Sequence, residues 1–329
     1  MNILVTGGAG YIGSHTVYQL ILQGHTVVVY DNLSTGHREA VPPEAHLVIG
    51  DIRDKVLMSD VLNNYSIQAV IHFAANSLVG ESMLQPAKYY QNNVVATLTL
   101  LETMLACGVT QIVFSSTAAV YGEATRWPIT EDMPTQPTNV YGRTKLIIEE
   151  MLTDFCKAYG LVYVSLRYFN AAGALTGGFI GEDHTPETHL IPLVLKTAMG
   201  QRSSIDIYGT DYATEDGTCI RDYIHVVDLA QAHVLAVLHL LSGGESKIYN
   251  LGSEKGFSVR EVIDNARTIT GMNINVRETE RRAGDPAVLI ASSQKIKSEL
   301  SWQPCCSDLA SIIKDAWFWH KEHPRGFNK

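Results

Sequence analysis

Short apolar runs alternate with amphipathic segments along the first half of the chain. The apolar runs predict strands at 2–6, 26–31, 46–50, 69–73, 111–116 and 162–167. The segments between them predict helices at about 12–24, 54–64, 87–107 and 141–158. Gly24, Gly108 and Gly160 stand where three of these helices should end. Strands that alternate with helices predict a doubly wound parallel α/β sheet, covered by helices on both faces.

The second half of the chain is less regular. It predicts helices near 189–200, 228–241 and 258–271, loops at 172–188 and 209–219, and short strands between them. We therefore expect a first domain at 1–171 and a smaller mixed α/β lobe at 172–329, with some segments of the lobe returning to the first domain. The sequence contains no internal repeat and no low-complexity linker, so the two parts should share an interface.

The predicted helix at 87–107 is apolar on every side. From Tyr89 to Thr110 the only charged residue is Glu102. A helix that is apolar all round is buried all round. One side should cover the sheet, and the other side needs either the second lobe or a second copy of the chain. We expect a homodimer.

Composition narrows the class of protein. The chain has 329 residues, of which 46% are hydrophobic and 18% charged, as in ordinary globular proteins. A net charge of −9 argues against nucleic acid and anionic membranes as partners. No apolar run is as long as a membrane span, and no signal-peptide pattern precedes the first strand. The five cysteines form no C-x-x-C pair, which favours a reduced, cytoplasmic protein.

The 12 histidines show no H-E-x-x-H motif or other ligand spacing. We interpret them as structural or surface residues and expect no metal site.

A glycine-rich turn follows the first predicted strand. Residues 6–13 read TGGAGYIG, with Gly7, Gly10 and Gly13 spaced three apart, and they lead into a helix. Such a turn brings the backbone close to a pyrophosphate, which then lies at the N-terminus of the helix. The sequence therefore predicts a Rossmann-type dinucleotide site.

Three further strand ends extend this site. Asp31 lies 18 residues beyond Gly13, where a carboxylate binds the adenine ribose and repels a 2′-phosphate. This favours NAD over NADP, with Arg38 nearby as the contrary signal. Asp51-Ile52 and Phe73-Ala74-Ala75 follow the third and fourth strands, at the same predicted edge of the sheet.

The segment YGRTK at 141–145 carries candidate catalytic residues. Of the 15 tyrosines, only Tyr141 has a lysine four positions on, at Lys145, and side chains with this spacing share a helix face. The lysine ammonium and a nicotinamide cation would favour phenolate, and a pKa lowered by about three units requires roughly 4 kcal/mol. Tyr141 could then take a proton from a substrate hydroxyl while hydride leaves the same carbon, with Thr117 relaying the proton. The alternative is a surface Tyr–Lys pair.

These motifs resemble a known family. TGGAGYIG, Ser115-Ser116-Thr117 and Y-x-x-x-K look like those of an extended short-chain dehydrogenase/reductase. HFAANSLVGESM (72–83), RYFNAAGA (167–174), YGTDYATEDGTCIRDYIHVVDLA (208–230), YNLGS (249–253) and RRAGDPA (281–287) resemble the UDP-glucose 4-epimerase family within it. The resemblance implies interconversion of UDP-galactose and UDP-glucose through a 4-keto sugar, with tightly bound NAD.

The resemblance also implies roles for individual residues. The expected NAD contacts are Gly7, Gly10, Tyr11, Ile12, Gly13, Asp31, Asn32, Ser34, Thr35, Gly36, Asp51, Ile52, Phe73, Ala74, Ala75, Ser77, Asn92, Ser115, Tyr141, Lys145 and Phe169. The expected UDP-sugar contacts are Thr117 on the sugar hydroxyl, Asn170 on the diphosphate, Leu190 against the nucleotide through its backbone, Tyr208 on uracil, Arg221 and Arg282 on phosphate, and Asp285 on a ribose or uracil group.

Some positions depart from the family pattern. Thr117 replaces a common serine, Ser77 a common lysine, and His189 a common asparagine. Leu289 is intermediate in bulk where size decides whether an N-acetyl sugar fits, so UDP-N-acetylglucosamine and UDP-glucuronate remain alternative substrates. Ala118 and Ala119 replace the Asp-Glu pair of the 4,6-dehydratases, which argues against dehydration.

Two alternative functions do not involve epimerisation. One is a net dehydrogenase, which would need added NAD and accumulate NADH. The other is a non-catalytic NAD-binding regulator, although such proteins often lack the tyrosine or the lysine that this chain retains.

Overall fold

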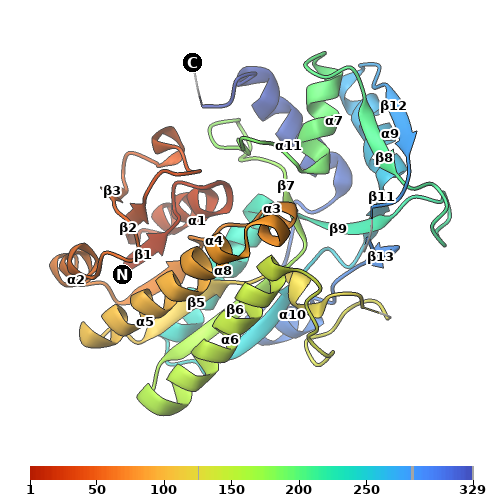
Figure 1. Cartoon of the computed structure of the whole chain (residues 1–329). Coiled ribbons are helices and arrows are strands. Elements are labelled where there is room, and N and C mark those ends of the chain that lie inside the picture. The colour runs from red at the N-terminus through yellow and green to blue at the C-terminus, as the bar shows by residue number, and fades with distance from the viewer. Residues whose placement is uncertain (125, 283–284, 328–329) are drawn as a thin grey trace.

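A seven-stranded parallel sheet forms the centre of the larger part of the molecule (Figure 1). The computed structural model describes residues 1–124, 126–282 and 285–327. The strand order is β10-β6-β5-β4-β1-β2-β3. These strands are β1 (Asn2–Thr6), β2 (Thr26–Asp31), β3 (His46–Ile49), β4 (Ala69–His72), β5 (Gln111–Ser115), β6 (Val162–Tyr168) and β10 (Lys247–Leu251). The order reverses direction between β1 and β4, the topological switch point at which ligands bind in such sheets.

Alternating side chains of each strand build two separate cores, one on each face of the sheet. Ile3 and Val5 of β1 belong to one core, and Leu4 belongs to the other. The first core is closed by α1 (Tyr11–Leu22) and α8 (Val226–Leu241). The second core is closed by α2 (Lys55–Asn64), α5 (Ala96–Ala106) and α6 (Val140–Tyr159). Because both faces are covered, the strands are apolar throughout, which is why they stand out in the sequence.

Most of the remaining elements gather beyond the carboxyl ends of the large sheet, around a third core (Figure 1), whereas the helix at 294–300 packs on β10 and adds Ile296 to the first core. Helices α7, α9 and α11 pack there on the parallel pair β8–β12, beside a small sheet of β7, β9, β11 and β13. The strands are β7 (Asn170–Ala172), β8 (Ile205–Tyr208), β9 (Ile220–His225), β11 (Gly256–Ser258), β12 (Val276–Thr279) and β13 (Val288–Leu289). The helices are α7 (Leu190–Ala198), α9 (Val259–Thr270), α10 (Gln294–Leu300) and α11 (Leu309–Glu322). Short helices η1 (Arg38–Ala40), α3 (Val79–Leu84) and η3 (Ala118–Tyr121) complete the elements.

The six strands and four helices predicted for the first half are confirmed, apart from the form of one helix. All three glycines expected at helix ends adopt a positive φ. The seventh strand, β10, lies where a short strand was predicted between two helices, but the sequence pattern did not specify that it pairs with β6 in the large sheet. Helix α8 likewise packs against α1, so both elements cross the expected boundary between the two parts. The division at residue 171 itself stays a prediction.

The helix expected at 87–107 is not one regular α-helix. It consists of α4 (Pro86–Tyr89), a π-helical segment η2 (Tyr90–Val95) and α5. Within the π-helical segment Asn93 is buried, and its amide donates to the Asn76 carbonyl at 3.0 Å and to Thr144 Oγ1 at 3.1 Å. The helix is also not buried all round, since Val95 is 41% exposed and Leu98 38%. The second half of the chain therefore does not cover these side chains.

None of the helices in the described ranges is both long enough and apolar enough to span a bilayer.

Candidate active site

A cleft of about 1410 Å³ opens at the carboxyl ends of the large sheet and is lined by residues from both halves of the chain. A pocket for one small ligand typically measures about 300–1,000 Å³. The cleft therefore has room for more than one ligand of ordinary size. Of the residues proposed from sequence as sites, the cleft is lined by Gly7, Gly10, Tyr11, Ile12, Gly13, Asp31, Asn32, Ser34, Thr35, Gly36, Asp51, Ile52, Phe73, Ala74, Ala75, Ser77, Asn92, Ser115, Thr117, Tyr141, Lys145, Phe169, Asn170, Tyr208, Arg221, Arg282, Asp285 and Leu289.

The glycine loop is shaped for close approach of a ligand. Gly7 has φ +73°, and a Cβ there would lie 2.6 Å from the backbone nitrogen of Ala74, so only glycine fits. Gly10 is the N-cap of α1 and has no side chain to bind the first N–H groups of the helix. Those N–H groups are thus available to an anion, and the helix dipole favours negative charge there. The loop fits the pyrophosphate of a dinucleotide.

Asp31 is held in place at the end of β2. Its Oδ2 accepts a hydrogen bond from the Ala9 N–H at 3.0 Å, and its Oδ1 accepts from the Leu33 N–H at 2.8 Å. Burial raises the pKa of the carboxyl, and these two hydrogen bonds oppose that shift. The carboxylate is therefore fixed beside the glycine loop, as ribose recognition requires.

Asp51 has a partner that the sequence did not suggest. Arg53 Nε donates to Asp51 Oδ1 at 2.8 Å, and this guanidinium holds the pKa of the carboxyl below its usual range. The Asp51 carboxylate, expected to contact NAD, is thus already engaged by a neighbouring cation.

Helix α6 presents Tyr141 and Lys145 to the cleft. Its N-cap Asn139 accepts a hydrogen bond from the Gly142 N–H at 2.8 Å, which starts the helix just before the tyrosine. Lys145 is buried; its Nζ donates to the Ser115 carbonyl at 2.8 Å and lies 4.8 Å from the Phe114 ring centroid. The distance from this Nζ to the Tyr141 ring centroid is 5.9 Å. The tyrosine, the lysine and Thr117 are brought together as predicted.

The lowered pKa expected for Tyr141 depends on Lys145 and a bound nicotinamide cation together, and in the chain without a cofactor the pKa is raised instead. Burial raises the pKa of Tyr141 to about 12, and a hydrogen bond with the Thr117 side chain opposes this only partly. Burial also lowers the pKa of Lys145 to about 7, although the nearby carboxylate of Glu149 acts in the other direction. A lysine that is partly neutral near pH 7, with its amine turned to a carbonyl, contributes little positive field at the phenol.

A buried ion pair lies behind the catalytic helix. Arg167 Nε on β6 donates to Glu149 Oε1 on α6 at 2.9 Å, and Arg167 Nη1 donates to the Tyr121 hydroxyl at 2.8 Å. That hydroxyl in turn donates to Asn250 Oδ1 on β10 at 2.8 Å. The network joins α6, β6, η3 and β10, and so fixes the helix that carries Tyr141 to the sheet.

The second half of the chain lines the far side of the cleft with aromatic and basic groups. The Arg282 guanidinium lies 3.8 Å from the Tyr208 ring centroid, and Arg221 Nη2 binds Asp285 Oδ1 at 2.7 Å. Within the described residues Leu190 does not line the cleft, although its neighbour His189 does. Ala283 and Gly284 of the RRAGDPA motif lie outside the described residues.

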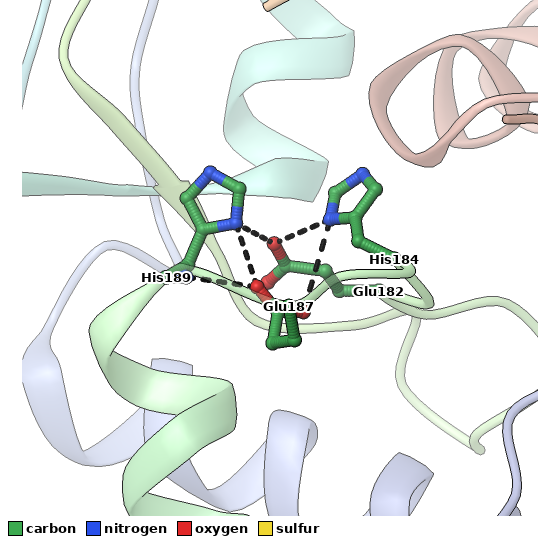
Figure 2. A group of neighbouring side chains, drawn as sticks. All are labelled: Glu182, His184, Glu187 and His189. Carbon is green, nitrogen blue, oxygen red and sulfur yellow. Dashed lines mark hydrogen bonds and ion pairs between the residues drawn. The ribbon is translucent and has the colours of Figure 1, made fainter. Parts of the chain in front are cut away.

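The sequence analysis missed one group of side chains at the cleft. Glu182, His184, Glu187 and His189 converge from the loop before α7 (Figure 2). The expectation that the histidines are scattered therefore fails for this loop. A signal was present, since three acids and two histidines fall within the eight residues 182–189, but their spacing matches no common ligand motif.

Comparison with known proteins gives one consistent result. The family described as the NAD dependent epimerase/dehydratase family matches residues 3–252. A UDP-glucose 4-epimerase of Halalkalibacterium halodurans is 58% identical over 328 residues, which cover 100% of this chain and 98% of that protein.

Two crystal structures give the same picture. One of a UDP-glucose 4-epimerase has a TM-score of 0.98 at 54% identity and covers 100% of both chains. One of the Bifidobacterium longum UDP-glucose 4-epimerase, in complex with NAD+ and UDP, has a TM-score of 0.93 at 39% identity and covers 99% of this chain and 100% of that one. With this fold, this cleft and this coverage, the chain belongs to the NAD dependent epimerase/dehydratase family.

Proposed function

We propose that the chain is an NAD-dependent 4-epimerase that interconverts UDP-galactose and UDP-glucose. The observation that carries the proposal is the meeting of Tyr141, Thr117 and Lys145 in a cleft that also contains the glycine loop and the basic groups of the second half. The names of the relatives and the ligands of the Bifidobacterium longum structure support it.

The chemistry follows from the acidity of the sugar. The hydrogen at C4 of a hexose has no neighbouring carbonyl, so removing it as a proton cannot invert the centre. The chemistry that bound NAD supplies is acceptance and return of hydride at this carbon. Gly7, Gly10 and Gly13 would hold the pyrophosphate of NAD. Asp31 would bind the adenine ribose, and its carboxylate would repel the 2′-phosphate of NADP.

The side chains of the cleft manage the proton. Tyr141 removes the proton of the 4-hydroxyl as the 4-keto sugar forms, and returns it after the sugar has turned over. Thr117, hydrogen-bonded to Tyr141, holds the same hydroxyl. The raised pKa of Tyr141 favours return of the proton to the sugar. To remove the proton from the 4-hydroxyl, Tyr141 must first be a phenolate, which requires positive charge nearby. A protonated Lys145 and a nicotinamide cation would provide this charge together.

The same cleft argues against dehydration. A 4,6-dehydratase eliminates water with an acid and a base placed directly after the threonine. Here Ala118 and Ala119 line the cleft at those positions and carry no proton. Leu289 also lines the cleft, and UDP-glucuronate and UDP-N-acetylglucosamine remain the alternative substrates to be tested.

Proton NMR of the purified protein with UDP-galactose and no added NAD tests the proposal. An equilibrium mixture with UDP-glucose is expected, because NAD is regenerated in each cycle. Accumulation of a 4-keto product only when NAD is added would indicate a net dehydrogenase. No turnover of UDP-galactose, UDP-glucuronate or UDP-N-acetylglucosamine by protein that contains stoichiometric NAD would overturn the proposal in favour of a regulator.

We also propose a cytoplasmic homodimer formed by η2 and α5. Val95 and Leu98 are the large apolar side chains that this segment exposes, and the five cysteines, all free, suit a reducing compartment. Light scattering after size-exclusion chromatography should give a dimer that Leu98→Asp converts to a monomer. Leu22→Asp, at an exposed leucine of α1, should remain dimeric. A monomeric unmodified protein would refute the dimer.

A further inference from the structure

Four side chains with metal-binding atoms meet in the loop between β7 and α7 (Figure 2). His189 Nδ1 lies 2.9 Å from Glu182 Oε1 and 2.9 Å from Glu187 Oε1. His184 Nδ1 lies 3.2 Å from Glu182 Oε1 and 3.8 Å from Glu187 Oε2. One atom from each residue can be chosen so that all lie within 4.8 Å of one another. Both histidines therefore turn the same ring nitrogen, Nδ1, toward the two carboxylates.

The carboxylates of this group are buried, and hydrogen bonds do not satisfy all of its atoms. The side chains of Glu182 and Glu187 are only 4% and 3% exposed, whereas those of His184 and His189 are 30% and 46% exposed. Within the described residues, Glu187 Oε2 and His184 Nδ1 are buried and have no hydrogen-bond partner. Two buried carboxylates require nearby positive charge, and buried polar atoms that lie at ion-pair distance from one another without forming a hydrogen bond are suited to share a cation.

We propose that Glu182, His184, Glu187 and His189 bind one divalent transition-metal ion, for which Zn²⁺ is the representative probe. Imidazole nitrogen and carboxylate oxygen are ordinary zinc ligands at about 2.0–2.1 Å, and at these lengths tetrahedral ligand atoms lie about 3.3 Å apart. The observed separations of 2.9, 3.2 and 3.8 Å lie on both sides of that value. Mg²⁺ and Ca²⁺ prefer oxygen ligands and fit the two imidazoles poorly.

Protons compete with a metal ion for these side chains, because imidazole and carboxylate bind a metal only in their deprotonated forms. Metal binding at this site should therefore weaken as the pH falls.

The site lies against the glycine loop. The rings of His184 and Tyr11 meet edge to face, with centroids 6.2 Å apart, and Tyr11 is the first residue of α1. A bound ion would therefore fix the loop that forms one wall of the cleft. The inference concerns binding only and does not depend on the proposed epimerase activity.

A second group of metal-binding residue types provides an internal control. Asp228, Cys305 and Cys306 also lie close together. There the carboxylate of Asp228 already accepts hydrogen bonds from the N–H groups of Cys305 and Cys306 and from Ser307 Oγ. This carboxylate anchors the turn before α11, and we do not expect metal binding to depend on the two cysteines.

Isothermal titration of the untagged, full-length, NAD-containing protein with Zn²⁺, after removal of metals by chelation, tests the inference. One equivalent should bind, and Co²⁺ in its place should give the visible absorption of a tetrahedral site. His184→Ala/His189→Ala should weaken binding at least about 100-fold, a loss typical of removing metal ligands or their supports. Cys305→Ser/Cys306→Ser and His46→Ala should bind as the unmodified protein does. Circular dichroism and NAD content establish that each variant is folded.

Glu187→Gln provides a second, milder variant, which keeps the shape of the side chain and should also weaken binding. Failure of the folded, unmodified protein to bind Zn²⁺ stoichiometrically would overturn the inference and leave the group as a proton-held ion-pair network. Binding that is unchanged by the double histidine variant, or lost in the cysteine variant, would also overturn it.

Discussion

Replacing Tyr141 by phenylalanine removes one hydroxyl group, and so distinguishes an effect on catalysis from an effect on folding. The change removes only the hydroxyl, and the ring can keep its place on α6. In the structure this hydroxyl is hydrogen-bonded to the Thr117 side chain. Thr117 Oγ1 also accepts from the Ala119 N–H at 3.1 Å, so it keeps a partner when the phenol is lost. The loss of stability should therefore be that of one hydrogen bond, about 1 kcal/mol.

The effect on activity should be much larger. A positioned general acid or base contributes about 10²- to 10⁴-fold to a rate, which corresponds to about 2.7–5.5 kcal/mol of activation free energy. Burial holds the pKa of Tyr141 at about 12 in the chain by itself. A phenol with that pKa is about 10⁻⁴ ionised at pH 8, so bound ligands must lower the pKa for Tyr141 to act as a base. In the unmodified enzyme, kcat should consequently rise with pH as the phenolate forms.

The assay follows conversion of UDP-galactose to UDP-glucose by proton NMR, with NAD content measured after denaturation and stability measured by urea unfolding. Tyr141→Phe should retain NAD and lose at least about 100-fold in kcat. Tyr89→Phe is the control, because Tyr89 is buried and, among the described residues, is not one of those that line the cleft. Its hydroxyl donates to the Leu78 carbonyl at 2.7 Å and to Glu81 Oε2 at 2.9 Å, so this variant should lose at least as much stability as Tyr141→Phe and keep its activity.

Turnover of Tyr141→Phe within a few fold of the unmodified protein would refute the assignment of the base. An equal loss of activity in Tyr89→Phe would refute it as well, because the loss would then reflect a change in folding.

Three further predictions concern the cofactor, the buried ion pair and pH. Asp31→Asn removes the charge that repels a 2′-phosphate, so the preference for NAD over NADP should fall about tenfold or more, measured as the dinucleotide retained after exchange; an unchanged preference would contradict the role of Asp31. Glu149→Gln leaves Arg167 as an uncompensated buried charge and should lower the free energy of unfolding, measured in urea, by about 3–5 kcal/mol. The double variant Glu149→Gln/Arg167→Met removes that charge and should recover much of the lost stability. A loss under about 1 kcal/mol in the single variant would contradict a buried ion pair. Burial lowers the pKa of His15, His72 and His233 from 6.5 to about 4, 3 and 4, so below pH 6.5 only the unfolded chain gains these protons. The free energy of unfolding should then fall by about 1.6 kcal/mol in total for each histidine as the pH is lowered from 6.5 to 5, and a pH-independent value in urea unfolding would exclude neutral histidines in the core.

Local patterns were sufficient for much of the architecture and for the position of the cleft. The strands of the first half are buried on both faces, so each reads as an apolar run, and the glycines after α1, α5 and α6 mark their ends. The glycine loop depends on a turn of a few residues, and the pairing of Tyr141 with Lys145 depends on one helical turn. Features of this range are encoded by neighbouring residues, and they could be predicted.

Local sequence specifies the residue types at the cleft, whereas contacts between distant segments specify the burial and the charge of each side chain. Strand β10 joins β6 across about 80 residues of chain, a pairing that no local pattern specifies. Burial depends on every neighbour in space, and it raises the pKa of Tyr141. The fold also places the Ser115 carbonyl where the Lys145 amine donates to it. The convergence of Glu182, His184, Glu187 and His189 requires a folded loop, because their spacing matches no regular helix or strand. Spacing along the chain shows which functional groups are present. Packing determines which of these groups come into contact and whether each one is charged.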